Sequence, residues 1–77
     1  MNTARETGVV KFWNAAAGWG FVIRQDGSEI FAHWRQLSES PINADGHRYL
    51  VQGQTVEFAT TNTAKGPAAS DIVVVEN

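Results

Sequence analysis

The sequence has no cysteine and only two prolines, and its apolar residues never form a long run. Without cysteine, no disulfide or thiolate-bound metal can stabilise the fold, and this fits a cytosolic protein. The longest apolar stretch, Ile72 to Val75, is far too short to cross a bilayer. The polar stretch Met1 to Thr7 lacks the apolar segment of a signal peptide. We therefore expect a cytoplasmic protein with no membrane partner.

Positive charge is also scarce. Six Lys and Arg residues face eight Asp and Glu residues, which gives a net charge of −2. A protein that binds nucleic acid mainly through its phosphates is usually basic. The composition therefore excludes a global positive field, and any nucleic-acid site must depend on stacking and on local placement of charge.

Residues that carry catalysis are few. His33 and His47 are the only histidines, and no metal-ligand spacing or pair of carboxylates accompanies them. Ser28 and Ser38 have no recognisable base nearby in the sequence. We therefore predict that the protein is not an enzyme and that it uses no metal, cofactor or small-molecule substrate.

What the sequence does contain is β-forming residues. Segments rich in Val, Ile, Phe, Trp and Thr, each bounded by turn residues, predict five short strands. These strands are 9–14, 19–24, 29–34, 55–60 and 69–75. They predict one all-β domain over residues 1–77, folded as a five-stranded antiparallel barrel, since closure removes exposed sheet edges.

The connections follow from turn chemistry. Gly27 predicts a tight hairpin between the second and third strands, and Pro67 predicts a loop or a strand start before the last one. The segment 34–38 predicts a single helical turn that Pro41 ends. We expect residues 1–6 and 76–77 to be frayed.

Alternation along the strands separates two faces of the barrel. The aliphatic residues share the face that predicts the core. The expected core residues are Val10, Val22, Ile30, Ala32, Val56, Phe58, Ile72 and Val74. The largest rings fall on the opposite face, which is unusual for a small domain.

These rings gather on the first three predicted strands, together with one lysine. The set is Lys11, Phe12, Trp13, Trp19, Phe21, Phe31, His33 and Trp34. Every base has a π-face, and each stacked base contributes roughly 1–3 kcal/mol to binding. Gly18 and Gly20 lack side chains, so a bound strand or the opposite wall of the barrel can approach closely. We predict a single-stranded nucleic-acid site; a protein-interaction or self-assembly domain that uses the same aromatic patch is the alternative.

Several segments carry a family resemblance. Lys11-Phe12-Trp13-Asn14 resembles the Lys-Trp-Phe-Asn opening of the bacterial cold-shock proteins, with the two rings exchanged. The segments 17–22 and 30–34 resemble the two ribonucleoprotein motifs of that family, and 50–54 and 64–69 resemble its later conserved segments. In an RNA-recognition motif the two motifs occur in the reverse order. The resemblance to the cold-shock family extends from Thr7 to Val73.

The resemblance implies a single cold-shock domain with an OB-type barrel that binds single-stranded RNA or DNA. The implied protein is a pyrimidine-leaning RNA chaperone of low sequence specificity that could influence transcription termination or translation. We expect a monomer, with a strand-swapped dimer as the other option. The implied nucleic-acid-binding residues are Lys11, Phe12, Trp13, Trp19, Phe21, Phe31, His33, Trp34, His47 and Lys65.

The chain also departs from the family pattern. Ala16 and Ala17 stand where the family commonly has an acidic residue and a lysine. The missing lysine removes a phosphate contact, and each lost contact lowers the single-strand salt slope by about 0.7. The middle loop, residues 36–49, is longer than is common; it could cap one end of the groove, but we expect it to be filler. Trp19 and Trp34 stand where phenylalanine is usual and offer more stacking area.

Overall fold

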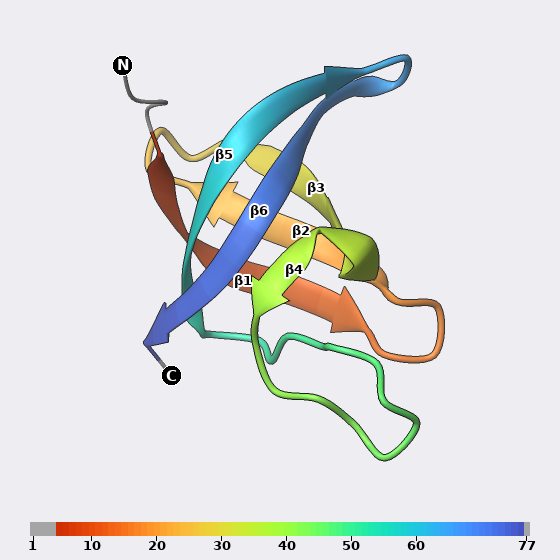
Figure 1. The fold of residues 1–77 in the computed structure, drawn as a ribbon. Coiled ribbons are helices and arrows are strands. Elements are labelled where there is room, and N and C mark those ends of the chain that lie inside the picture. The colour runs from red at the N-terminus through yellow and green to blue at the C-terminus, as the bar shows by residue number, and fades with distance from the viewer. Residues whose placement is uncertain (1–4, 77) are drawn as a thin grey trace.

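The computed structural model describes residues 5–76 of the chain. Six strands and one short 3-10 helix lie in this part, joined by turns and loops (Figure 1). Their bounds are β1 Glu6–Asn14, β2 Trp19–Arg24, β3 Glu29–His33, η1 Trp34–Gln36, β4 Leu37–Glu39, β5 Thr55–Thr63 and β6 Gly66–Glu76. Within these residues, no helix has the length and apolarity needed to span a membrane.

The strands close into a barrel. The sheet order is β3-β2-β1-β5-β6-β4, and a further pairing of β3 with β6 closes the ring. Neighbours along β3-β2-β1-β5-β6 are antiparallel, whereas β3–β6 and β4–β6 are parallel. The OB-type all-β barrel is thus confirmed, but it is mixed and not purely antiparallel. The reason is geometric, because alternating directions around a ring of five strands must leave one like-directed pair.

Several strand ends differ from the prediction. β1 begins at Glu6, and the β5–β6 hairpin continues past residue 60, so that it projects beyond the rest of the barrel (Figure 1). Pro67 is the second residue of β6, where it pairs with Asn62, so it marks the start of the strand, as one of the two predicted options had it. The helical turn is shorter than predicted, because Leu37 starts the short strand β4 before Pro41 is reached. Of the residues expected to be frayed, 1–4 and 77 lie outside the described part of the chain.

The predicted hairpin between β2 and β3 is present. Gly27 has a φ of +90°, and its N–H donates to the Arg24 carbonyl. Asp26 accepts hydrogen bonds from the Ser28 hydroxyl and backbone N–H at 2.6 and 2.9 Å, and these bonds lower the pKa of the Asp26 carboxyl. The turn therefore has its own hydrogen bonds and fixes the register of β2 against β3.

The core follows the predicted alternation. All of the expected core residues are buried except Val74, which is half-buried and packs against the others. Each fully buried aliphatic or aromatic side chain contributes roughly 1.5–3 kcal/mol relative to exposure. Further buried hydrophobic residues were not predicted, and they are Leu37, Leu50, Ala68 and Ala69.

A bulge in β1 decides which aromatic rings face outward. The register against β2 shifts between Val10 and Phe12, so one extra residue, Lys11, lies in the strand. Because of this extra residue, Phe12 is 43% exposed although Val10, two positions earlier, is buried. The next residue, Trp13, is half-buried and packs against the core.

An ion pair ties the start of β1 to its neighbours. Arg24 donates from Nε and Nη2 to the two carboxylate oxygens of Glu6, each at 2.8 Å, and Thr60 donates to the same carboxylate. These hydrogen bonds, those from Arg24 first, lower the pKa of Glu6. The pair therefore connects β1, β2 and β5 on the side of the sheet where β1 begins.

Candidate nucleic-acid interface

Aromatic rings from β1, β2 and β3 contact one another in an unbroken series. The ring of Trp19 lies 5.8 Å from that of Phe12, 6.0 Å from Phe21 and 6.1 Å from Phe31, measured between centroids. Phe21 and Phe31 lie 5.9 Å apart in an edge-to-face arrangement. Such pairs contribute about 0.5–1.5 kcal/mol beyond the area they bury. The rings therefore hold one another in place while part of each remains open to solvent.

The series continues past the end of β3. Phe31 contacts His33 at 6.4 Å, and His33 contacts Trp34 at 5.9 Å. Trp34 in turn stacks on His47 of the middle loop at 5.0 Å, with 29° between the ring planes. We define the aromatic platform as Phe12, Trp19, Phe21, Phe31, His33, Trp34 and His47. The middle loop, expected to be filler, thus contributes one of its rings.

Gly18 fixes the position of Trp34. The Trp34 N–H donates to the Gly18 carbonyl at 2.9 Å, and a Cβ on Gly18 would lie 2.5 Å from Cδ1 of the indole. The φ of Gly18 is +81°, which residues with side chains rarely adopt. Gly20 allows a similarly close approach of β1, since a Cβ there would clash with the Phe12 carbonyl oxygen. Close approach of neighbouring segments, the Trp34 indole at Gly18 and the adjacent strand β1 at Gly20, thus explains both glycines.

Trp13 lies outside the platform. It packs against the hydrophobic core, and among the described residues its ring takes no part in the platform's series of contacts. Its Nε1 is buried and has no hydrogen-bond partner within residues 5–76. Trp13 is half-buried, as are Trp19 and Trp34, and a role in stacking stays a prediction for this residue.

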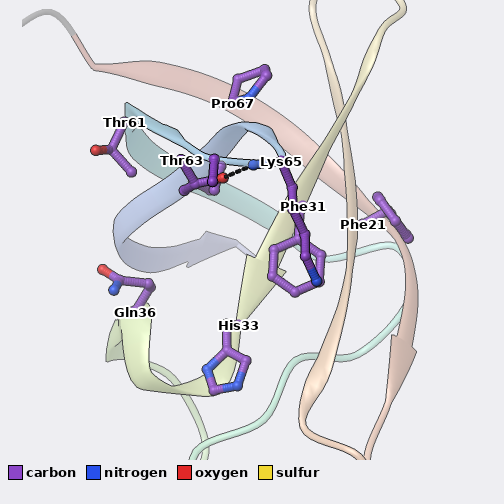
Figure 2. A pocket seen from close by; sticks show the side chains of 11 residues that line it. Phe21, Phe31, His33, Gln36, Thr61, Thr63, Lys65 and Pro67 are labelled. Atoms are coloured by element: carbon purple, nitrogen blue, oxygen red, sulfur yellow. Dashed lines mark hydrogen bonds between the residues drawn. The ribbon is translucent and has the colours of Figure 1, made fainter.

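A groove with a volume of about 620 Å³ runs beside the platform. Phe21, Phe31 and His33 form one side, and the tip of the β5–β6 hairpin forms the other (Figure 2). In that view the Lys65 side chain extends from the hairpin toward the ring of Phe31 (Figure 2). The remaining lining residues are Gln36, Thr61, Thr63, Ala64, Pro67, Ala68 and Ala69.

Sequence reasoning placed Lys65 at the site but missed Gln36 and the hairpin threonines. They reach the groove because β3 pairs with β6, with Phe31 opposite Ala68. Nothing local in the sequence reports this parallel pairing. The sequence offers one signal for these residues. The end of β5 is a run of exposed polar residues that continues the strand but has no aliphatic residue to bury.

Half of the cations are neutralised by carboxylates. Arg5 forms an ion pair with Asp71 at 3.2 Å, and Arg24 with Glu6 at 2.8 Å. Lys11, predicted to contact phosphates or base edges, forms an ion pair with Glu29. Its side chain is still half exposed, so solvent and ligand can reach it.

The other three cations lie beside the platform. Arg35, Arg48 and Lys65 form no ion pair within residues 5–76. The guanidinium carbon of Arg35 lies 5.5 Å from the centroid of the Trp34 ring, a cation–π contact. Lys65 borders the groove, and Arg48 follows His47 in the middle loop. Although the protein is acidic overall, its unpaired positive charge therefore lies around the aromatic face.

A closed, mixed barrel that carries an aromatic platform on β1, β2 and β3 defines an OB-type binding barrel. The family model of the 'Cold-shock' DNA-binding domain matches residues 6–75. The chain belongs to the cold-shock domain family, whose members generally bind nucleic acid. This confirms the resemblance that the motifs indicated.

Individual relatives agree with this assignment. The chain is 42% identical over 66 residues to cold shock-like protein CspC of Bacillus cereus, covering 86% of this chain and 94% of that protein. It is 41% identical over 69 residues to cold shock-like protein CspE of Escherichia coli, covering 88% and 93%. A cold shock-like protein of Thermotoga maritima is 38% identical over 69 residues, covering 90% and 97%. Cold-shock domain proteins bind single-stranded nucleic acids and are not enzymes.

Proposed function

We propose that this protein binds single-stranded RNA or DNA on the aromatic platform, with low sequence specificity and a pyrimidine preference. The observation that carries the proposal is the unbroken series of ring contacts from Phe12 to His47 on one exposed face. Every base has a π-face, so a row of rings accepts many sequences. Each stacked base contributes roughly 1–3 kcal/mol, enough for useful affinity over several bases.

The residues of the site have separate proposed roles. The platform rings stack on bases, and Lys65 contacts phosphates from the far side of the groove. Lys11 reaches a phosphate only when the phosphate displaces Glu29. Trp13 supports the platform from the core side and does not touch the ligand. The site is therefore dominated by stacking, and its charge contribution is small.

In the cell, we propose an RNA chaperone that keeps transcripts unpaired in the cytoplasm. Stacking on the platform stabilises the unpaired strand, because paired bases do not present their faces. Such an activity could influence transcription termination or translation. We propose that the protein acts as one domain and as a monomer, since a dimer formed through the platform would cover the stacking rings.

A fluorescence titration tests the proposal. Trp19 and Trp34 lie in the platform, so their emission reports stacking directly. Adding oligothymidylate or an unstructured RNA at low salt is expected to quench tryptophan fluorescence with a saturable curve. Absence of quenching at tens of micromolar oligonucleotide overturns the proposal.

Sedimentation separates this proposal from self-assembly through the same rings. If the platform binds nucleic acid, the protein stays monomeric as its concentration rises, and Trp19→Ala weakens oligonucleotide binding without changing the sedimentation coefficient. A concentration-dependent oligomer that Trp19→Ala dissociates supports the interaction domain instead.

A further inference from the structure

A small pocket lies at the Trp34 end of the platform, between the β1–β2 turn and the middle loop. Its volume is about 110 Å³. It is lined by Ala15, Ala16, Ala17, Gly18, Trp34, Asn43, His47 and Arg48. The pocket thus brings together the two departures from the family pattern, the alanines of the turn and the long loop.

The middle loop holds its side of the pocket in a defined shape. Ile42 and Arg48 form an antiparallel bridge, and Asn43 N–H donates to the His47 carbonyl at 2.8 Å. The Asn43 side-chain oxygen accepts from the backbone N–H groups of Asp45 and His47 at 2.9 and 3.0 Å. The stack of His47 on Trp34 then joins this small hairpin to the platform. Arg48, the next residue, is positioned by these contacts.

The charge at the pocket is positive. Arg48 is half-buried and donates from Nη1 to the Ser40 carbonyl at 2.9 Å. This bond uses one of the five N–H donors of a guanidinium. No carboxylate is among the described residues that line the pocket, and Glu39 and Asp45 of the same loop are outside it. A guanidinium with free donors, no carboxylate partner and an open pocket in front of it suits an oxyanion.

We propose that this pocket is a phosphodiester subsite, in which Arg48 contacts the backbone phosphate of the strand stacked on Trp34 and His47. The inference rests on the proposed function and adds to it one residue and one contact. Ala17, where the family commonly has a lysine, lines the same pocket. The long loop therefore supplies, from the opposite wall, the positive charge that the turn lacks.

The salt dependence of oligothymidylate binding tests the subsite. For Arg48→Gln, the log–log slope is expected to be shallower by about 0.7, and affinity at 50 mM salt is expected to fall roughly eightfold. Adding Ala17→Lys to Arg48→Gln is expected to restore both. That lysine comes from a different loop, so it cannot replace the hydrogen bond from Arg48 to the Ser40 carbonyl. Rescue would therefore show that Arg48 acts through its charge and not by holding the loop in shape.

Controls make each result decisive. Arg5→Gln removes a cation that is paired with Asp71 away from the platform, and it is expected to leave the slope unchanged. Against an oligothymidylate with a neutral methylphosphonate backbone, Arg48→Gln is expected to bind as the wild type does. An unchanged slope for Arg48→Gln, or no rescue by Ala17→Lys, overturns the subsite alone. If the wild-type protein binds no oligonucleotide, the proposed function fails as well.

Discussion

The ammonium group of Lys11 forms an ion pair with the carboxylate of Glu29, linking the bulge of β1 to the start of β3. Both side chains are about half exposed, at 50% and 44%. At such exposure an ion pair contributes little to the stability of the fold. Its effect on binding is larger, because the carboxylate neutralises the lysine closest to Phe12 until a phosphate displaces it.

Glu29→Gln is therefore expected to strengthen binding. The neutral amide leaves Lys11 free, so one more phosphate contact forms and the log–log salt slope becomes steeper by about 0.7. Titration of oligothymidylate at several salt concentrations measures the change. Lys11→Gln added to Glu29→Gln is expected to remove the gain, and an unchanged slope in Glu29→Gln contradicts a role for Lys11 at phosphates.

Trp19→Ala is expected to weaken oligonucleotide binding. Trp19 contacts Phe12, Phe21 and Phe31, so its loss removes one stacking surface and loosens its neighbours. The expected loss is about 1–3 kcal/mol, or roughly 5- to 150-fold in affinity. Anisotropy of a labelled oligothymidylate measures it. Ile23→Ala, in the same strand at an exposed position outside the platform, is the control and is expected to bind as the wild type does.

Gly18→Ala separates backbone strain from the placement of Trp34. The positive φ makes alanine unfavourable by about 1 kcal/mol or more, and the new Cβ lies 2.5 Å from the indole. Both stability and affinity are expected to fall. Gly27→Ala has the same φ problem, but its Cβ would meet nothing within 4 Å, so only its stability is expected to fall. Urea unfolding and oligonucleotide titration of both variants give the comparison; equal losses of affinity contradict the role of Gly18.

Glu6→Gln is expected to reduce the dependence of folding stability on pH in the acidic range. Hydrogen bonds from Arg24 and Thr60 lower the pKa of Glu6 in the folded state. A lowered carboxyl pKa stabilises the folded state above the unfolded value of about 4.3 and loses this effect as pH falls through the folded value. The urea midpoint of Glu6→Gln is therefore expected below that of the wild type at pH 7. The two midpoints are expected to converge in acid below about pH 4; a constant difference contradicts the assignment.

The sequence predicted most of the core and the rings that form the aromatic platform, because strand alternation is a local rule. Strict alternation sufficed for Val22 in β2 and for Ile30 and Ala32 in β3, two strands that a tight turn connects. The bulge at Lys11 breaks that rule, and one extra residue reverses the faces of Phe12 and Trp13. No local pattern reveals such a bulge.

Contacts between segments distant in the sequence were the other feature that the sequence could not predict. The stack of His47 on Trp34 and the pairing of Lys11 with Glu29 join residues that only the closed barrel brings together. Strand β4 was missed because it has three residues, two of them exposed. Its pairing with β6 comes from tertiary packing of Leu37 and not from its own β propensity.

The three tryptophans supply the most direct test of the aromatic platform. Trp19 and Trp34 belong to it, whereas Trp13 lies outside its series of ring contacts and has a buried Nε1. The measurement is a ¹H–¹⁵N spectrum of the indole N–H groups, recorded as oligothymidylate is added to saturation. We predict large shifts for Trp19 and Trp34 and little change for Trp13. Movement of Trp13 alone, or of none of the three at saturation, would contradict the account.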